Sequence, residues 1–197
     1  MSKTVSALAL CAAVSMALWS TSCSNRREAK ASMKQEKDRK TAPEFALKDA
    51  NGQTVHLADY KGKVVLLDFW ATWCGPCKIE IPWFMEFEQQ FKERGFAVVG
   101  VSMDEDGWAA VKPYLMKMKV NYRVLLGNDQ VGTLYGGVES LPTTFLIDRQ
   151  GKVASIHIGV STGKEEFKDA IVQLLDAPRN ISSAPVGGPI AILAGAR

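Results

Sequence analysis

Short apolar runs alternate along the chain with longer stretches in which apolar residues recur every three or four positions. The runs at 64–70 and 96–102 are rich in β-branched and aromatic residues, which is typical of buried strands. Between them, apolar side chains recur at helical spacing from Ile79 to Phe91, a pattern that indicates an amphipathic helix. This alternation of strands and helices predicts an α/β domain of three layers with a central mixed sheet.

Turn residues divide the rest of this pattern into shorter elements. Asn51-Gly52 is typical of the turn of a β-hairpin, and Gly151 marks a second turn between two apolar segments. Apolar residues also recur at regular spacing after the run at 96–102 and again toward the end of the chain. We therefore expect hairpins at 44–57 and 143–157, helices at 107–118 and 163–175, and a strand at 123–126.

The two ends of the chain lack this periodicity. Lys3 precedes an apolar stretch, and small residues then lead to Cys23, an arrangement typical of an export signal. The polar segment that follows has seven Lys or Arg against three acids between Arg26 and Lys40, and the last twenty residues are rich in Gly, Pro and Ser. We therefore predict an export signal at 1–23, a flexible basic linker at 24–42, a folded domain at 43–177 and a disordered tail at 178–197.

Composition places the domain among ordinary soluble proteins. The chain has 197 residues, 47% of them hydrophobic and 23% charged, with a formal net charge of +3. The basic stretch after the export signal carries no interleaved aromatic residues, so it does not resemble a nucleic-acid-binding surface. We expect no nucleic acid among the partners of this protein.

The chemistry is concentrated in two cysteines at C-x-x-C spacing. Cys74 follows the first buried run, and Cys77 lies in the first turn of the predicted helix, where free backbone N–H groups favour a thiolate. A closed zinc site would need further ligands, and the other two cysteines, Cys11 and Cys23, lie at the N-terminus. A purely structural disulfide over so short a loop would remove little chain entropy. We therefore predict a redox-active dithiol, with no metal and no other cofactor.

The segment from Asp68 to Lys78 resembles the active-site segment of thioredoxins, and the run from Cys74 to Pro82 resembles that of TlpA- or ResA-like thiol-disulfide oxidoreductases. The resemblance implies a thioredoxin-like fold with an N-terminal β-hairpin and a central insertion, which would be residues 103–131 here. It also identifies Leu141-Pro142-Thr143 with the cis-proline loop of the family. A tight turn suits a cis proline, although the sequence does not show the isomer.

The resemblance also implies roles for the residues of the dithiol. Cys74 would attack a substrate disulfide as the thiolate, and Cys77 would resolve the mixed disulfide. Asp68 corresponds to the buried acid of thioredoxins, and Glu80 to the acid of the TlpA-like branch. Carrying both acids departs from either pattern, so the sequence leaves open which one relays a proton. Alternatively, Asp68 is a hydrogen-bonded residue at the end of a strand, and Glu80 an exposed acid in the first turn of a helix.

Around the dithiol we expect a surface that binds protein substrates. Trp73 would be an exposed apolar contact, and backbone groups near the cis-proline loop would pair with an extended segment of the substrate. Gly75-Pro76 is the dipeptide of thioredoxin itself, which favours reduction over oxidation. The substrate-binding residues are therefore predicted to be Trp73, Gly75, Pro76, Leu141 and Pro142.

Other side chains are interpreted as structural. We expect Trp70, Trp83, Met85, Met103 and Met116 in the core, and His56 and His157 on the surface.

These observations predict a thiol-disulfide oxidoreductase that reduces disulfides of exported proteins, among which the family includes apocytochrome c and proteins of metal-centre assembly. The alternatives are a peroxidase of the peroxiredoxin class, a disulfide-inserting oxidase and a non-catalytic tethered module. A peroxidatic cysteine usually stands in a P-x-x-x-T-x-x-C setting, and the proline is missing before Cys74.

The export signal indicates a location for this activity. The small residues before Cys23 resemble a lipoprotein signal, although Ser20 departs from that pattern; an uncleaved anchor and free secretion are the alternatives. We expect a monomer, anchored to the membrane by its N-terminus and facing the periplasm. A membrane thiol relay would supply its electrons, because no soluble nicotinamide pool lies outside the cell.

Overall fold

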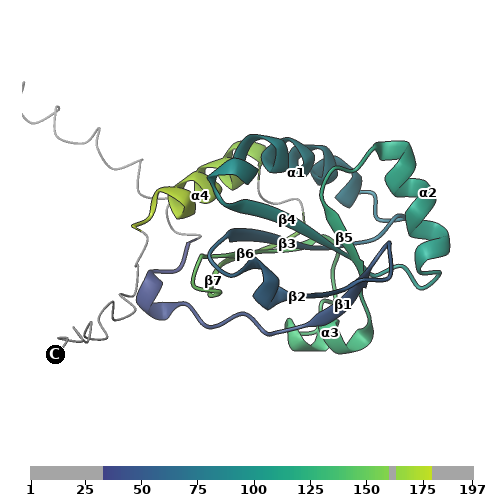
Figure 1. Cartoon of the computed structure of the whole chain (residues 1–197), viewed down its shortest axis with the longest axis horizontal. Coiled ribbons are helices and arrows are strands. Elements are labelled where there is room, and N and C mark those ends of the chain that lie inside the picture. The colour runs from purple at the N-terminus through teal and green to yellow at the C-terminus, as the bar shows by residue number, and fades with distance from the viewer. Residues whose placement is uncertain (1–32, 160–162, 179–197) are drawn as a thin grey trace, which may run out of the picture.

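The computed structural model describes residues 33–159 and 163–178, and these form a seven-stranded sheet with helices on both faces (Figure 1). The strand order is β2-β1-β5-β4-β3-β6-β7. The three central strands β3, β4 and β5 are parallel to one another, and the remaining neighbours pair antiparallel, so the sheet is mixed as predicted. The strands are β1 (Ala46–Asp49), β2 (Thr54–His56), β3 (Val64–Trp70), β4 (Phe96–Ser102), β5 (Arg123–Leu126), β6 (Thr143–Ile147) and β7 (Val153–Ile158).

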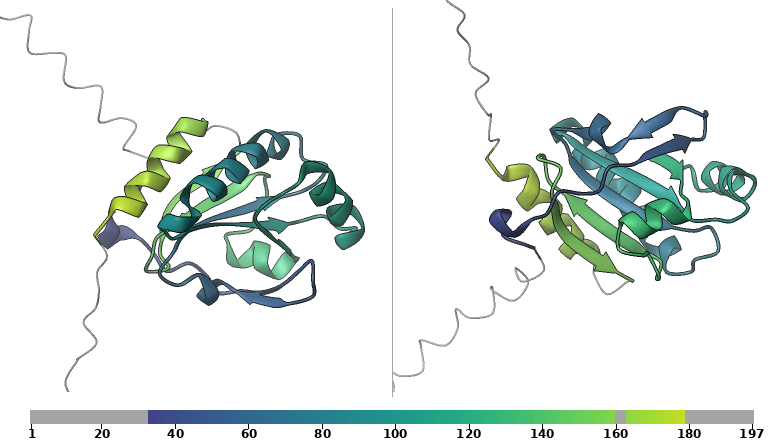
Figure 2. Two further views of the ribbon diagram at one scale, coloured as in Figure 1. Left: turned by 45° about the horizontal axis from the view of Figure 1, so that its top comes forward. Right: turned by 90° about the horizontal axis from the view of Figure 1, so that it is seen from below.

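Helices cover the sheet unequally. The two long helices α1 (Cys77–Phe91) and α4 (Lys164–Asp176) lie side by side on one face, and the short helix α3 (Asp129–Leu134) lies on the other (Figure 1, Figure 2). Helix α2 (Trp108–Met118) packs beside α1 at the β5 side of the sheet. Three short 3-10 helices complete the described elements: η1 (Glu36–Asp38), η2 (Leu57–Tyr60) and η3 (Lys92–Arg94).

The middle of the sheet is buried on both faces. Every residue of β3 and of β4 is buried, because α1 and α4 cover one face while α3 and the N-terminal hairpin cover the other. Side chains alternate between the faces along each strand, so Leu66 and Trp70 point to the α1 core whereas Leu67 and Phe69 point to the opposite core. This rigid centre fixes the end of β3, where the dithiol loop begins.

The predicted fold class and all the predicted hairpins, strands and helices are confirmed. The insertion at 103–131 contributes α2, β5 and the start of α3, and β5 completes the parallel centre of the sheet. Helix α3 was not predicted, since a six-residue helix carries too little periodicity to be recognised. Of the five expected core residues, Trp70 is buried and Met116 is 73% exposed. The other three, Trp83, Met85 and Met103, are half-buried and pack against the cores.

Residues 33–42, which we assigned to a flexible linker, instead lie along the edge strand β7. Lys34 donates a backbone hydrogen bond to the carbonyl of Ala154 at 2.8 Å, and Thr41 forms a β-bridge with Lys152. An edge strand presents unpaired backbone N–H and C=O groups, and this segment satisfies some of them. The linker prediction is therefore wrong for 33–42.

The remaining predictions on the chain ends lie outside the described residues. They concern the export signal at 1–23 with Cys11 and Cys23, the first part of the linker, and almost all of the tail. Within residues 33–159 and 163–178, every helix is too short or too polar to cross a membrane.

Candidate functional site

The dithiol lies where β3 passes into α1. Cys74 and Cys77 are joined by a disulfide, with their Cα atoms 5.4 Å apart. Pro76 occupies the N-cap of α1 with φ near −56°, a value that its ring favours, so Cys77 is the first residue of the helix. The backbone N–H of Cys77 donates to Cys74 Sγ at 3.2 Å. When the disulfide is reduced, this hydrogen bond and the helix dipole favour a thiolate on Cys74.

The loop around the dithiol is exposed although the sulfurs are not. Trp73 is 68% exposed, and Gly75 and Pro76 are also exposed. In the disulfide form, Cys74 is 4% and Cys77 is 1% exposed. An incoming partner therefore meets Trp73 and the Gly75-Pro76 turn first, and Cys74 is the nearer of the two sulfurs to solvent.

The cis-proline loop is adjacent to this turn. Phe69 of β3 is paired with Thr143 of β6, so the residues just before Thr143 lie beside the end of β3. The Leu141–Pro142 peptide bond is cis, as the family pattern implies. Pro142 has no N–H, and its carbonyl accepts a hydrogen bond from Gly159 at 2.8 Å. Pro142 is buried and offers no backbone donor, and Leu141 beside it is half-buried.

Asp104 holds the loop that leads to Cys74, a role that the sequence did not reveal. Its carboxylate accepts hydrogen bonds from the backbone N–H of Thr72 at 2.9 Å and from the hydroxyl groups of Thr72 and Ser102. Asp104 is 7% exposed and follows β4, the neighbour of β3. The loops that follow β3 and β4 are thus linked by hydrogen bonds, at a point just before the dithiol in the chain.

Replacing Asp104 by Asn is expected to loosen this loop. The amide offers one acceptor oxygen where the carboxylate offers two, so at least one donor is left unpaired, at a cost of about 1–3 kcal/mol. The free energy of unfolding measured with urea should fall by that amount, and proteolytic cleavage near Trp73 should become faster. Asp106→Asn, at an exposed position in the same loop, is the matched control. Equal stability of the two variants would contradict this role.

Asp68 lies within the sheet on the face covered by α1. It is 1% exposed, and burial raises its pKa from 3.8 to about 7, against the hydrogen bond from the hydroxyl of Thr144 to Asp68 Oδ1 at 3.1 Å, which lowers it. The carboxyl group therefore exchanges its proton near neutral pH. This is the burial that we expected for the acid of the thioredoxin pattern.

Glu80 projects from the first turn of α1 into the same layer. It is 1% exposed, and neither carboxylate oxygen has a hydrogen-bond partner among the described residues. Burial, followed by repulsion from Asp68, raises the pKa of Glu80 from 4.5 to about 8. Glu80 is therefore not an exposed acid stabilised by the helix dipole. The two acids act on each other, so their protons belong to a coupled pair.

The two histidines differ from the prediction in one case. His56 is exposed at the end of β2, whereas His157 on β7 is only 5% exposed. Along β7, Ile156 and Ile158 are exposed by 44% and 60%, whereas His157 between them is buried. Helix α4 covers the His157 face of this edge strand, where Phe167 packs on the ring, and no local pattern in the chain indicates that contact.

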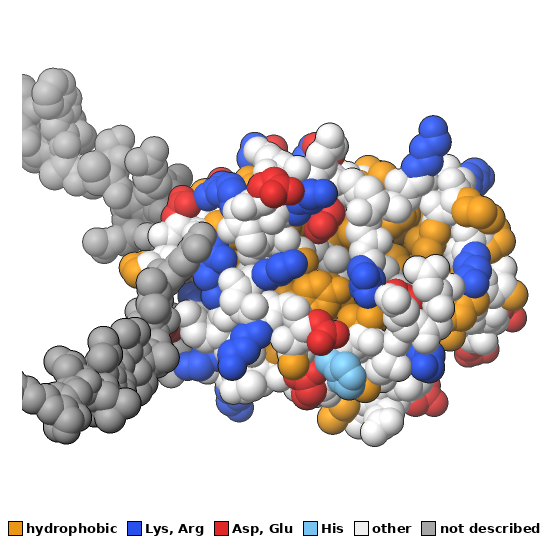
Figure 3. Space-filling model, viewed as in Figure 1, with side chains coloured by type: hydrophobic (Ala, Val, Ile, Leu, Met, Phe, Trp, Pro, Cys, Tyr) orange, Lys and Arg blue, Asp and Glu red, His pale blue; other side chains and the backbone are white. Residues whose placement is uncertain are grey.

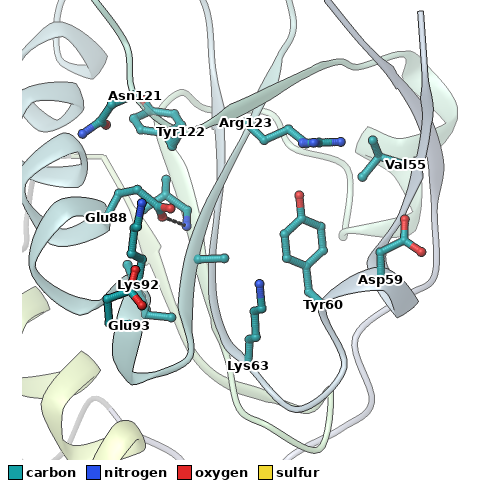
Figure 4. Close-up of a pocket in the computed structure, with 13 residues that line it drawn as sticks. Val55, Asp59, Tyr60, Lys63, Glu88, Lys92, Glu93, Asn121, Tyr122 and Arg123 are labelled. Carbon is teal, nitrogen blue, oxygen red and sulfur yellow. Dashed lines mark hydrogen bonds between the residues drawn. The ribbon is translucent and has the colours of Figure 1, made fainter. Parts of the chain in front are cut away.

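A cavity of about 540 Å³ lies at the other end of the parallel strands, between η2 and the end of α1 (Figure 4). Tyr60, Lys63 and Arg123 point into it from one side, and Glu88 and Lys92 from the other. Its charges balance, in line with the interspersed acidic and basic side chains of the face drawn in Figure 3. The starts of β4 and β5 line it, whereas the dithiol follows the end of β3, so the cavity does not hold the reacting groups.

Metal binding has no support in the described part of the chain. No group of three or more His, Cys, Asp or Glu side chains in residues 33–159 and 163–178 is arranged to hold a metal ion. The disulfide pair is therefore the chemical centre of the site.

Comparison with known proteins agrees with this geometry. Residues 39–156 match the model of the AhpC/TSA family. The thiol-disulfide oxidoreductase ResA of Bacillus subtilis (strain 168) is 43% identical over 122 residues, which cover 61% of this chain and 67% of that protein. ResA of Geobacillus thermodenitrificans (strain NG80-2) is 40% identical over 129 residues, covering 65% and 72%. A Chlorobium tepidum structure assigned as the thiol:disulfide interchange protein DsbE aligns with a TM-score of 0.65 at 39% identity, covering 70% of this chain and 96% of that one.

Proposed function

Because the chain belongs to the AhpC/TSA family and is a thiol-disulfide oxidoreductase of the ResA type, we propose that it works as a reductase of disulfides in exported proteins. The observation that carries thiol-disulfide exchange is the hydrogen bond from the N–H of Cys77 to Cys74 Sγ at the start of α1, and the Gly75-Pro76 dipeptide supports the direction of reduction. The hydrogen bond prepares a thiolate on Cys74, and the same dipeptide occurs in thioredoxin, for which a potential of about −270 mV is typical.

The reaction begins with the reduced dithiol. The Cys74 thiolate attacks one sulfur of the substrate disulfide, forms a mixed disulfide and releases the other substrate sulfur as a thiolate, which takes up a proton. Cys77 then loses its proton and attacks Cys74 Sγ, so that the enzyme disulfide forms and the second substrate thiol leaves. Two electrons pass in total from the enzyme to the substrate, and the protons that the two substrate sulfurs take up are exchanged through solvent, because Cys74 starts as a thiolate.

The buried acids serve the proton transfers of the second half-reaction. Cys77 must lose its proton inside the protein, where water does not reach it, since it is 1% exposed. Asp68 and Glu80 both lie on the same face as the dithiol helix and both exchange protons close to neutral pH. We assign Asp68 as the base for Cys77 because Thr144 already hydrogen-bonds its ionised form. Glu80, whose pKa is raised to about 8 by burial and by the charge of Asp68, ionises after Asp68 and is the second proton-exchanging group of the pair.

Replacing Glu80 by Gln is expected to change the pH dependence of disulfide reduction. Glu80 has the higher pKa of the two acids, so it is still protonated where Asp68 ionises and becomes charged only near pH 8. Glu80→Gln should therefore remove an upper inflection of the profile of kcat/KM near pH 8 and leave the rising limb near pH 7 in place. The measurement is kcat/KM for a protein disulfide between pH 5 and 9. Glu86→Gln, on an exposed position of the same helix, is the control. An unchanged profile would show that Glu80 does not influence the proton-accepting group.

The substrate would be a protein rather than a small disulfide. Trp73 and Ile79 are large apolar side chains exposed by 68% and 53% on either side of the dithiol, and Leu141 adds half-buried apolar surface at the cis-proline loop. An exposed apolar surface next to a reactive group is typical of a protein-binding site. Apocytochrome c and proteins of metal-centre assembly are the substrate classes that we propose.

The cellular setting is proposed from the sequence of the chain ends. The export signal and Cys23 support a lipoprotein that faces the periplasm and acts as a monomer near the membrane. Electrons would come from a membrane thiol relay that reduces the Cys74–Cys77 disulfide after each cycle.

Reduction of insulin by the reduced domain tests the proposed direction, together with the reduction potential measured against glutathione. We expect turnover of insulin and a potential below the glutathione range. A potential near −120 mV, typical of strong oxidants, would instead support disulfide insertion. Consumption of hydrogen peroxide at a comparable rate would favour a peroxidase.

A further inference from the structure

Polar side chains form a row across the three neighbouring strands β3, β6 and β7. Asp68 of β3 is paired with Gly100 of β4 on one side and with Thr144 of β6 on the other, and Thr144 is paired with His157 of β7. Side chains of directly paired residues lie on the same face of a sheet. The row therefore runs on the α1 and α4 face from the middle of the sheet to the edge strand.

The first link in this row is a hydrogen bond. The hydroxyl of Thr144 donates to Asp68 Oδ1 at 3.1 Å, and both residues are 1% exposed. The next neighbour is His157, because directly paired residues have Cβ atoms about 4.5–5.5 Å apart. A hydroxyl that donates to Asp68 can still accept from a group on its other side. Thr144 thus stands between two titratable side chains.

His157 is held in a defined position at the edge. Its ring packs against Phe167 of α4 with centroids 4.6 Å apart, and its Nε2 lies 2.9 Å from Ser155 Oγ. Burial lowers its pKa below the ordinary value, so the ring is largely neutral at neutral pH and accepts a proton reversibly. The mechanism described above does not use this residue.

We propose that Thr144 and His157 carry the proton of Asp68 along the sheet to the edge strand β7. This inference rests on the proposed role of Asp68 in taking the proton from Cys77. Asp68 is 1% and His157 is 5% exposed, and β7 is an edge strand of the sheet, so His157 is the member of the row nearest that edge. The row thereby gives the proton of Asp68 a path that avoids the dithiol loop. That loop would be covered while a substrate is bound.

The proton balance needs no further reagent. Protonated Asp68 donates its proton to Thr144 Oγ1 while the hydroxyl proton of Thr144 passes to a ring nitrogen of His157. Asp68 is then ionised, Thr144 is unchanged, and His157 is an imidazolium that loses its proton to water. Over all of these proton transfers, the Cys77 thiol becomes a thiolate and one proton reaches solvent.

Two other titratable groups respond to the charge of Asp68, and the experiment must distinguish a proton path through them from the path through His157. Glu80 of α1 and Tyr122 at the start of β5 are both influenced by the charge of Asp68, and the hydroxyl of Tyr122 has no hydrogen-bond partner among the described residues. Through them, a proton could leave on the α2 side instead. That exit would not involve His157, so the two routes predict different behaviour of its ring.

The test follows the two histidines of the chain by NMR, one at each end of the sheet. In the reduced protein we expect the titration of His157 to show a second inflection at the pH where Asp68 ionises. Asp68→Asn should remove that inflection and lower the His157 midpoint by about 0.5–1 pH unit, because the imidazolium loses a nearby carboxylate. The exposed ring of His56, on the opposite edge strand β2, is the control for changes that do not depend on the row. A His157 titration that Asp68→Asn leaves unchanged would overturn the proposal.

Two further variants separate a relay from a structural role. Thr144→Val keeps the shape but removes the hydroxyl, so it should lower kcat/KM for insulin about threefold to tenfold and abolish the coupling of the two titrations. Thr144→Ser should restore both. If Thr144→Val matches wild type in coupling and rate, the route is wrong. Because the NMR coupling requires no turnover, a failure of insulin reduction by the wild-type protein would count against the proposed function alone.

Discussion

Replacing Cys74 by Ser is expected to abolish disulfide reduction, with at least a thousandfold loss of kcat/KM. The serine hydroxyl cannot form a disulfide, and the thiolate favoured by the N–H of Cys77 at 3.2 Å is lost with the sulfur. The measurement is insulin reduction by the purified domain at equal concentrations of folded protein. The change removes one buried sulfur and little volume, so the fold should persist by circular dichroism.

The companion variant Cys77→Ser should behave differently. It keeps the attacking thiolate but lacks the resolving thiol, so mixed disulfides with substrates should accumulate on Cys74. Trapping them in the periplasm and identifying the bound proteins tests the substrate classes proposed above. Stable adducts formed by Cys74→Ser instead of Cys77→Ser would reverse the assignment of the two cysteines.

The second large effect concerns stability, which is expected to fall with rising pH because of Asp68. The pKa of this group is about 7 in the folded protein against 3.8 as the ordinary value, so the folded state holds the proton more tightly. The resulting stability is fully present below pH 3.8 and is lost as the pH rises through 7. The loss is on the order of 4 kcal/mol if the full difference in pKa applies.

Asp68→Asn removes this dependence, because the amide is neutral at every pH. We expect the variant to be more stable than wild type at pH 8 and similar to it near pH 4, by urea unfolding at both values. The control is Glu139→Gln, which removes one carboxylate from an exposed position. The prediction would be contradicted if the free energy of unfolding of the wild-type protein, relative to that of Asp68→Asn, increased with pH.

Glu80 should contribute to the same trend, with its own loss centred near pH 8. The effects of Asp68→Asn and Glu80→Gln should not add, because each substitution removes the repulsion that raises the pKa of Glu80. The double variant measures that coupling directly.

The periodicity of the chain was sufficient to predict the main elements. The runs that became β3 and β4 are continuous and apolar because both faces of these strands are covered, and the helix after Cys74 shows its apolar side at helical spacing. These patterns involve only neighbouring residues, so they can be recognised without knowing what each element packs against. Helix α3 has too few residues to show such a pattern.

Some residues of the candidate site could likewise be predicted from the sequence, and others are brought together only by the tertiary structure. The C-x-x-C spacing, the helix start at Pro76 and the two acids were visible in the sequence because they depend on neighbouring residues. Asp104 was not visible, since its carboxylate reaches Thr72, 32 positions earlier, only because β3 and β4 are adjacent. Its value to the site comes from a contact between two loops.

The sequence by itself determined a dithiol at the start of a helix, on an α/β scaffold with an N-terminal hairpin, because hydrophobic period, turn residues and helix capping act over a few positions. The tertiary structure alone decided that Glu80 is buried beside Asp68, that residues 33–42 cover the edge of β7, and that Thr144 of β6 stands between Asp68 and His157 in the sheet. Each of these depends on strand order and register, which place residues tens of positions apart side by side. Burial then changes the free energy of their charges, and no local pattern encodes that change.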